Sequence, residues 1–208
     1  MRYHKVPDET IRRLPVYLRG LCSFPNNGSH SISSQQLADI LHVKSPQVRK
    51  DLSYFGDIGT PGVGYDIQKL TKHIRAILQL NNVHCAALVG YGNLGAALLK
   101  YTGFGTFCIE INTVFEKDPR KIGRVVRNIK IEEVSKISSL SKRGISIAIL
   151  AIPAAESQDV TDKLVNAGVG GILNFTSSYL SVPANVKVIN IDIGVSLACL
   201  PYYLPVGA

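Results

Sequence analysis

A glycine turn at residues 90–95 constrains the possible folds of this chain more than any other stretch. It reads G-Y-G-N-L-G, follows the apolar run C-A-A-L-V and precedes a helix-like run at residues 96–100. A strand, a G-x-G-x-x-G turn and a helix in this order are typical of a unit that binds the pyrophosphate of a dinucleotide. Gly90 permits the tight turn, Gly92 admits the pyrophosphate close to the backbone, and Gly95 lets the helix approach the strand. The sequence therefore predicts a phosphate site at the N-terminus of this helix.

An acidic residue after the next apolar run strengthens this interpretation. Residues 109–115 read as a second strand, and Glu116 ends it, 21 positions after Gly95. Dinucleotide-binding units place a carboxylate near this position to bind a ribose hydroxyl. Because Glu116 would repel a 2′-phosphate, we favour NAD over NADP, and we treat the basic residues between 120 and 130 as a solvated surface. The alternative is a glycine turn in another α/β protein that binds a different phosphate compound.

The rest of the second half alternates between strands and helices. Residues 145–152 predict a buried strand, residues 154–167 a helix stopped by a glycine, and residues 171–175 and 186–191 two short strands. This alternation predicts a parallel sheet with right-handed crossovers, so the fold class is α/β with a Rossmann domain. Ligands of such sheets bind at the carboxyl ends of the strands. The residues expected in the cofactor site are Gly90, Tyr91, Gly92, Asn93, Leu94, Gly95, Glu116, Lys117, Ile152, Pro153, Asn174, Phe175 and Asp192.

Composition and charge bound the class of protein. The chain has 208 residues, is 46% hydrophobic and carries a net charge of +8. Residues 1–80 hold 11 Lys and Arg against 6 Asp and Glu, so the smaller part has the larger excess, +5. This imbalance indicates a polyanion as a partner of the N-terminal part. No apolar run reaches the length of a membrane helix, and the N-terminus lacks the apolar stretch of a signal peptide. Four scattered cysteines favour reduced, buried thiols in a cytoplasmic protein.

The N-terminal part has the pattern of a helix-turn-helix. Residues 8–22 predict a first helix that contains Pro15, and residues 24–29 a loop. A second helix begins after the hydroxyl cap at residues 33–34. Ser45 is expected to cap a third helix, residues 46–55. This helix directs Gln47, Arg49, Lys50, Ser53 and Tyr54 outward, which are side chains suited to phosphate and base contacts. A solvated helix in an αα-hairpin is the alternative.

A glycine- and proline-rich segment follows the third helix. Residues 56–67 contain five Gly or Pro residues and an alternation of apolar residues that predicts a β-hairpin. A hairpin after a helix-turn-helix makes a winged helix, and an amphipathic helix over residues 70–78 completes the domain. The residues expected to contact DNA are Arg13, Ser45, Gln47, Arg49, Lys50, Ser53, Tyr54, Gly62, Gly64 and Tyr65.

These motifs resemble one known family. The run V-R-K-D-L-S-Y-F-G at residues 48–56, G-V-G-Y at 62–65 and the glycine turn at 90–95 closely resemble the Rex family of redox-sensing transcriptional repressors. Further similar stretches occur at residues 101–104, 118–124, 171–175 and 190–192, so that the resemblance covers nearly the whole chain. It implies a winged-helix domain at residues 1–80, a Rossmann NAD(H)-binding domain at residues 81–192 and a C-terminal dimerisation segment at residues 193–208.

The resemblance also implies a function. Members of the family are homodimers that bind double-stranded operator DNA and are released by NADH, with no metal and no membrane. The resemblance implies that Arg19 pairs with the partner's Asp192 in one state, and that Tyr101 approaches the nicotinamide in the other. It also implies that the C-terminal helix is exchanged between protomers, although Pro201 and Pro205 should shorten it here. The wing departs from the family pattern, because Thr60 and Pro61 stand where Lys or Arg is usual.

Catalysis is harder to support from the sequence. A dehydrogenase needs a general acid or base near the nicotinamide, and the only histidine of the second half, His84, stands at the wrong end of its strand. No catalytic pair and no metal-binding motif are apparent. We therefore expect a sensor with no enzymatic activity. A small NAD-dependent oxidoreductase and a CoA-binding domain, each with a basic accessory domain, remain as alternatives.

Overall fold

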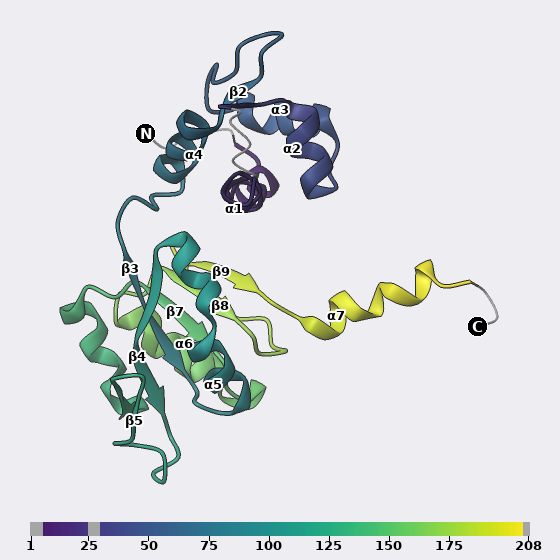
Figure 1. The fold of residues 1–208 in the computed structure, drawn as a ribbon. Coiled ribbons are helices and arrows are strands. Elements are labelled where there is room, and N and C mark those ends of the chain that lie inside the picture. The colour runs from purple at the N-terminus through teal and green to yellow at the C-terminus, as the bar shows by residue number, and fades with distance from the viewer. Residues whose placement is uncertain (1–5, 25–29, 206–208) are drawn as a thin grey trace. The chain divides into compact units, whose positions relative to one another are not determined.

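The computed structural model describes residues 6–24 and 30–205, so that most of the expected loop at residues 24–29 lies outside the described residues. The chain divides into two compact units (Figure 1). One contains Met1–Asn82 with Thr106–Cys108, and the other contains Val83–Gly105 with Ile109–Ala208. The predicted boundary after residue 80 lies close to this division. The division does not separate residues 193–208, and it assigns a short segment of the second half to the first unit.

The first unit is mainly helical. Its elements are α1 (Asp8–Cys22), β1 (Ser31–Ile32), α2 (Ser34–Leu41), α3 (Ser45–Ser53), β2 (Tyr65–Asp66) and α4 (Ile67–Ile77). One apolar core joins them, and Leu14, Leu18, Leu37, Val48 and Leu70 are fully buried in it. Buried residues recur at helical spacing within a helix, as Leu14 and Leu18 do in α1 and Leu70 and Ile74 in α4, so burial of one face of each helix holds the unit together.

The ends of the helices follow from local chemistry. Ser33 caps α2, and the side chain of Gln36 bonds back to the Ser33 N–H, which completes the expected capping box. Pro15 lies inside α1, seven residues after its start, and therefore does not mark the beginning of this helix. The prediction that Ser45 caps α3 was wrong. Lys44 is the cap residue and Ser45 is already helical; its hydroxyl accepts a hydrogen bond from Arg49 instead.

The wing is less regular than a hairpin. β2 pairs with β1 and not with the strand expected before the turn, and a single bridge, Thr60 to Gly64, holds the tip. Gly64 has φ +99°, and a Cβ there would lie 2.5 Å from the backbone oxygen of Ile32. Glycine is therefore required where the wing passes the end of β1. The ring of Tyr65 is buried in the core and anchors the base of the wing.

The second unit is built on one sheet. The strands that the described residues form are β3 (His84–Val89), β4 (Ile109–Glu116), β5 (Val125–Val126), β6 (Ile129–Glu133), β7 (Ile147–Leu150), β8 (Gly171–Asn174) and β9 (Lys187–Asn190). Their order is β5-β6-β4-β3-β7-β8-β9. All neighbours are parallel except β5 and β6. The short β5–β6 pair was not predicted, because the basic residues around it suggested solvated surface.

Helices and 3-10 segments complete the chain. They are α5 (Asn93–Lys100), η1 (Thr102–Phe107), η2 (Val134–Arg143), η3 (Ala154–Glu156), α6 (Ser157–Asn166), α7 (Ile193–Ala198) and η4 (Leu200–Tyr203). The expected helix at residues 154–167 is thus a 3-10 turn followed by α6. Alternate residues of β3 enter different cores: Ala87 and Val89 belong to the cluster with α6 and η2, and Leu88 to the cluster with α5. The sheet is therefore covered on both faces, as in Rossmann domains.

The expectation of buried cysteines was wrong. Cys22 and Cys199 are exposed, Cys85 and Cys108 are half-buried, and all four are free thiols. Cys22 is the last residue of α1, and Cys199 follows α7, whose apolar side chains are uncovered in a single chain. Within the described part of the chain, no helix has the length and apolar character needed to cross a bilayer.

Candidate functional site

The glycine turn joins β3 to α5 with the geometry that its spacing predicts. Gly90 has φ +97°, and a Cβ there would lie 2.3 Å from the backbone oxygen of Ala151. A Cβ on Gly95 would lie 1.9 Å from the oxygen of Gly90, so only glycine lets α5 come this close to the turn. At Gly92, the cap residue of α5, a Cβ would meet no atom within 4 Å. The open space of the turn is therefore at the middle glycine.

This open space faces the N-terminus of α5. The first turn of a helix has N–H groups with no intrahelical acceptor, and here they belong to Asn93, Leu94 and Gly95. The helix dipole adds a partial positive charge at the same place. Backbone N–H groups, a positive dipole end and space for close approach are the features that bind a pyrophosphate. The residues present thus fit a dinucleotide.

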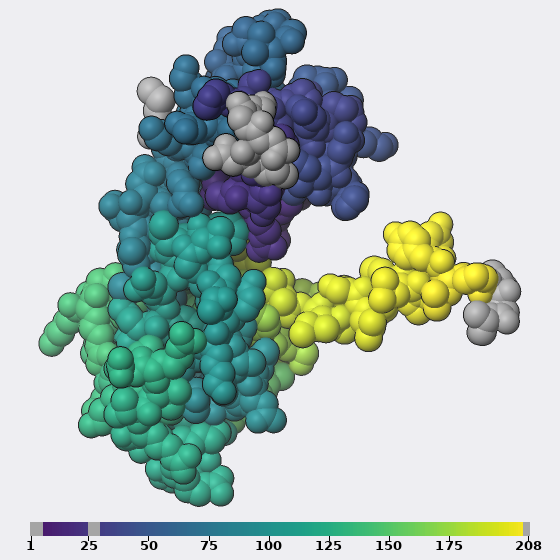
Figure 2. All heavy atoms as spheres, viewed as in Figure 1, coloured from purple at the N-terminus to yellow at the C-terminus, as the bar shows by residue number. Residues whose placement is uncertain are grey.

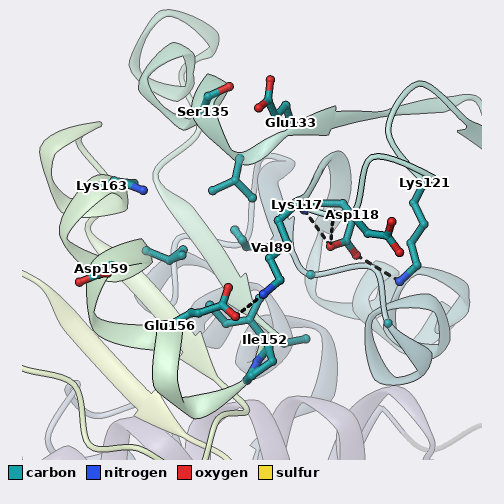
Figure 3. A pocket seen from close by; sticks show the side chains of 17 residues that line it. Val89, Lys117, Asp118, Lys121, Glu133, Ser135, Ile152, Glu156, Asp159 and Lys163 are labelled. Atoms are coloured by element: carbon teal, nitrogen blue, oxygen red, sulfur yellow. Dashed lines mark hydrogen bonds and ion pairs between the residues drawn. The ribbon is translucent and has the colours of Figure 1, made fainter.

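A cavity of about 590 Å³ lies beside the turn, at the carboxyl ends of β3, β4 and β7 (Figure 3). Here the strand order reverses, because the chain runs outward from β3 to β4 and β6 and returns to β7. Open α/β sheets bind their ligands at such a point. Of the predicted cofactor residues, the cavity is lined by Gly90, Gly92, Glu116, Lys117, Ile152 and Pro153.

The carboxylate of Glu116 is held by backbone N–H groups. It accepts hydrogen bonds from the N–H of Tyr91 at 2.9 Å, of Lys117 at 2.8 Å and of Asp118 at 3.2 Å. Burial alone would raise the pKa of Glu116, but the backbone N–H donors outweigh burial and hold the pKa below its usual range. Glu116 is therefore ionised and ties the glycine turn to the end of β4. Its negative charge lies on the cavity wall, where it would oppose an additional phosphate.

Two lysines at the cavity each pair with a carboxylate. Lys117 forms an ion pair with Glu156 of η3 (Figure 3). Lys121 donates to the backbone oxygen of Tyr91 at 3.0 Å and lies 3.5 Å from the Glu116 carboxylate. Neither residue was predicted as a site residue: Lys121 was assigned to a solvated surface, and Glu156 belongs to no motif. Both come from segments between strands, and only the folded sheet brings them to this cavity.

A smaller cavity of about 200 Å³ lies at the ends of β8 and β9. It is lined by the predicted residues Leu94, Phe175 and Asp192, together with Ile191 and Ile193. A dinucleotide spans the ends of several strands. In the strand order, β8 and β9 lie on one side of β3, and β4, which ends at Glu116, lies on the other. The two cavities together cover the carboxyl ends of β3, β4, β7, β8 and β9.

Asn174 has a structural task in this region. Its side chain is fully buried, and its amide nitrogen donates to the Ser178 oxygen and to the side chain of Asn190, both within 2.9 Å. Its amide oxygen accepts from the N–H and the hydroxyl of Thr176. The side chain of Asn174 is thus used to shape the turn after β8 and has little capacity left for a ligand.

Tyr101 lies far from the glycine turn of its own chain. It follows α5, packs edge-on against Phe104 and lines a cavity at the start of β4, next to Ile109 and Ile111. The cofactor cavity is at the other end of β4, and a strand of this length spans roughly 23 Å. Tyr101 can therefore approach a nicotinamide only if the segment moves or if the cofactor belongs to another subunit.

The candidate nucleic-acid interface comprises α3 and the wing. A cavity of about 420 Å³ lies between them and is lined by Arg49, Ser53 and the wing residues Gly62 and Gly64. Arg49 is exposed, and its Nη1 donates to the hydroxyls of Ser34 and Ser45 at 3.0 and 2.7 Å. Lys50 and Ser53 are exposed on the same helix. The ordered cation and the hydroxyls suit the phosphates of DNA.

Two of the predicted DNA residues, Tyr54 and Tyr65, are turned toward the core. Tyr65 is 9% exposed, and Tyr54 is half-buried against the core, so neither ring is fully available to a ligand. Tyr54 was predicted on the outer face because the helix was expected to continue to residue 55, but α3 ends at Ser53. Arg13 and Gln47 bond the buried carboxylate of Asp51 at 2.6 and 2.9 Å.

The expected switch residues lie in different units. Arg19 is exposed, and its guanidinium carbon is 5.6 Å from the ring centroid of Phe107, a cation–π distance. Asp192 is exposed and caps α7 through a hydrogen bond from the Val195 N–H. Their proposed ion pair joins two protomers, so it stays a prediction.

Comparison with known proteins agrees with this geometry. A family model described as "Putative DNA-binding protein N-terminus" matches residues 5–53, and a model described as "CoA binding domain" matches residues 81–178. The redox-sensing transcriptional repressor Rex of Chloroflexus aurantiacus is 44% identical over 95% of this chain and 94% of its own. The Rex protein of Desulfitobacterium hafniense is 41% identical over 97% of each chain. The chain belongs to the Rex family.

Solved structures of the family extend the comparison. A crystal structure of RSP in complex with β-NAD+ and operator DNA superposes with a TM-score of 0.89, at 34% identity over 96% of this chain and 92% of RSP. RSP in complex with β-NADH gives a TM-score of 0.84 at 33% identity, over 95% of this chain and 93% of RSP. The CoA-binding model matches the part of the chain that forms most of the sheet, whereas the relatives matched over 94% and 97% of their own length are named repressors.

Proposed function

We propose that this protein is a transcriptional repressor that binds operator DNA as a homodimer and is released from it by NADH. The observation that carries this proposal is the joint presence of an open glycine turn at the switch point of a Rossmann sheet and an exposed basic face on α3. The relatives matched over nearly the whole chain are named repressors, which supports a regulator over an enzyme. Among the described residues, no cluster of three His, Cys, Asp or Glu side chains could hold a metal ion.

The dinucleotide would lie across both cavities of the second unit. Its pyrophosphate would rest on the N–H groups at the start of α5, above Gly92. The Glu116 carboxylate, which is ionised, favours a ribose with free hydroxyls and disfavours a 2′-phosphate, so NAD is expected in preference to NADP. The nicotinamide would reach the smaller cavity near Phe175 and Asp192. The choice of NAD(H) as the cofactor is supported by RSP, of which one structure is in complex with β-NAD+ and another with β-NADH.

The homodimer is supported by the C-terminal segment. Ile193, Val195, Leu197, Leu200 and Leu204 are each more than half exposed. Figure 2 shows this segment extending away from the body of its domain, so that a single chain leaves its apolar side chains in water. An exposed apolar surface of this kind usually marks a protein–protein interface, here with a second copy of the chain. In a dimer the segment would be covered, and two α3 helices would be available for the two halves of a palindromic operator.

Release by NADH requires that the ligand binds one arrangement of the dimer better than the other. We propose that NADH stabilises a dimer in which the two α3 helices no longer match successive major grooves, and that NAD+, with its charged nicotinamide, stabilises this arrangement less. The Arg19–Asp192 pair between protomers would favour the DNA-binding arrangement.

A gel-shift experiment with the full chain tests the proposal. DNA fragments selected from a random palindromic library should be retained by the protein alone and with NAD+, and should be released by NADH. Selection of no preferred sequence would refute the DNA-binding part. An independent fluorescence titration gives the NADH concentration that saturates the protein. A DNA complex that persists at this concentration would refute the sensing part.

A further inference from the structure

A buried polar network beneath α3 fixes the orientation of one side chain on its outer face. Asp51 of α3 is fully buried, and its carboxylate is the centre of the network. It accepts hydrogen bonds from Thr10 Oγ1 at 2.9 Å and from the Tyr17 hydroxyl at 2.5 Å. Arg13 donates through Nε at 2.6 Å and Nη2 at 2.8 Å. The fifth bond comes from Gln47, one turn earlier on α3, whose Nε2 donates at 2.9 Å.

The carboxylate of Asp51 acts only as an acceptor. Burial would raise its pKa, but the hydrogen bonds from Arg13, Tyr17, Thr10 and Gln47 outweigh burial and lower the pKa to about 2. An ionised carboxylate has no proton to donate. Only the NH₂ end of the Gln47 amide can therefore face it, because the carbonyl end would place two acceptors together. The orientation of this amide follows from the chemistry of its neighbour.

The other end of the amide lies on the solvent side. Gln47 is half-buried, whereas Asp51 has no exposed surface. An amide carries its oxygen and nitrogen on different sides of one carbon, so binding of the nitrogen to the buried carboxylate leaves Oε1 as the outward acceptor. The neighbouring Arg49 and Lys50 are exposed. Gln47 thus presents a carbonyl oxygen within a surface of positive charge.

We infer that Gln47 contacts operator DNA through its carbonyl oxygen and selects a base that carries an exocyclic amino group in the major groove, with Asp51 as the positioning residue. Adenine N6 and cytosine N4 are the amino groups that the major groove presents. Guanine and thymine would place O6 or O4 against the Gln47 oxygen. A glutamine free to rotate could turn its NH₂ group fully outward and donate to these oxygens. In this network one N–H of Gln47 is bound to Asp51, so that rotation would break the bond and Oε1 stays on the outer side. This inference rests on the proposed function.

Base analogues provide the test. The full-length protein first selects its preferred operator from a random palindromic library, and each base pair is then varied for the wild type and for Gln47→Ala. At the position where the variant loses discrimination, adenine is replaced by purine, or cytosine by 2-pyrimidinone, which removes only the exocyclic amino group. The wild type should bind the analogue about tenfold more weakly than the natural base. The Gln47→Ala variant should bind both alike, and this comparison subtracts the weakened base pair.

A matched control exists on α2. Gln35 donates to Asp39, four residues later, at 2.7 Å, so Gln35→Ala removes the same contact from an exposed pair. It should leave the base preferences unchanged. The inference is overturned if no position depends on Gln47, if the selected base is guanine or thymine, or if removal of the amino group costs both proteins the same. If no sequence is selected at all, the proposed function fails together with the inference.

Asp51→Asn tests the positioning role. Asparagine offers both a donor and an acceptor, so it no longer fixes the Gln47 amide. The position read by Gln47 should then tolerate guanine or thymine, with discrimination reduced about tenfold, while other positions keep their preferences. A uniform loss at all positions would indicate that Asp51 only stabilises the domain, and would overturn this role. If the variant does not fold, the Gln47→Ala arm still decides the inference.

Discussion

Substitution of Gly92 by valine should separate cofactor binding from folding. A Cβ at this position would meet no atom within 4 Å, and its backbone, with φ −82° and ψ −163°, is open to residues with side chains. The residue caps α5 without a side-chain hydrogen bond, so the expected change in the free energy of unfolding is within about 1 kcal/mol. The added isopropyl group would instead occupy the space that a pyrophosphate needs.

The expected loss of NADH affinity follows from the contacts that become blocked. A phosphate that cannot approach the turn loses at least two hydrogen bonds to backbone N–H groups, each with a charged acceptor and each contributing about 1.5–3 kcal/mol. The sum is about 3–6 kcal/mol, which corresponds to a loss of about 10²- to 10⁴-fold in affinity. DNA binding should not change, because α3 and the wing belong to the other unit. Titration of NADH fluorescence and a gel shift with NADH measure the two effects.

Gly170→Val is the matched control, since a Cβ at Gly170 would also meet no atom within 4 Å. Gly170 directly precedes β8 and is not part of the glycine turn at residues 90–95. It should retain both NADH binding and release. Gly95→Ala is a contrast, because its Cβ would lie 1.9 Å from the Gly90 oxygen and should lower the melting temperature. Release of Gly92→Val from DNA at the NADH concentration that suffices for the wild type would refute the assignment of the turn as the sensor.

Three further predictions concern the interface, the acid stability and the dimer. Arg49→Ala should weaken operator binding and reduce the slope of log affinity against log salt by about 2, as expected for one lost phosphate contact in each protomer of the dimer; an unchanged slope in a salt titration would remove Arg49 from the interface. The lowered pKa of Asp51, about 2 against 3.8, contributes stability that is fully present above pH 4 and is lost as the pH falls toward 2. Between these pH values the wild type should lose about 2 kcal/mol more unfolding free energy than Asp51→Asn, and equal losses in denaturant titrations would contradict this account. Removal of residues 193–208 should convert the dimer to a monomer in light scattering, whereas a truncated chain that stays dimeric would place the interface elsewhere.

Much of the fold could be predicted from local patterns. The predicted helix at residues 8–22 matches α1, and the capping box at Ser33 marks the start of α2. The role assigned to Gly95 follows from sterics within one βαβ unit, because its Cβ would meet the oxygen of Gly90. The Cβ of Gly90 would meet Ala151, which follows the adjacent strand β7. Such features depend on residues that are neighbours in the chain or in adjacent elements, so sequence spacing is enough to find them.

The wrong predictions concern the ends of elements, the pairing of strands and the burial of side chains. The predicted cap at Ser45 and the predicted outward position of Tyr54 were both wrong, because α3 begins one residue earlier and ends two residues earlier than expected. The wing was expected as a hairpin, but its second strand pairs with β1, a partner more than thirty residues earlier. The four cysteines were expected to be buried from their apolar neighbours, yet burial depends on which face an element turns to the core.

The two domains, the glycine turn and the basic helix could be predicted from local patterns, because each depends on periodicity or on the conformational needs of glycine. Only the folded structure shows which groups several polar side chains can bind. The side-chain hydrogen bonds of Asn174 are made within the turn after β8 and to β9. Tyr101 lies at the end of β4 that is remote from the cofactor cavity of its own chain. The Gln47 amide is oriented by the Asp51 carboxylate, which also binds residues of α1. A hydrogen bond needs two groups within about 3 Å, and that distance is set by the packing of segments that sequence spacing leaves unrelated.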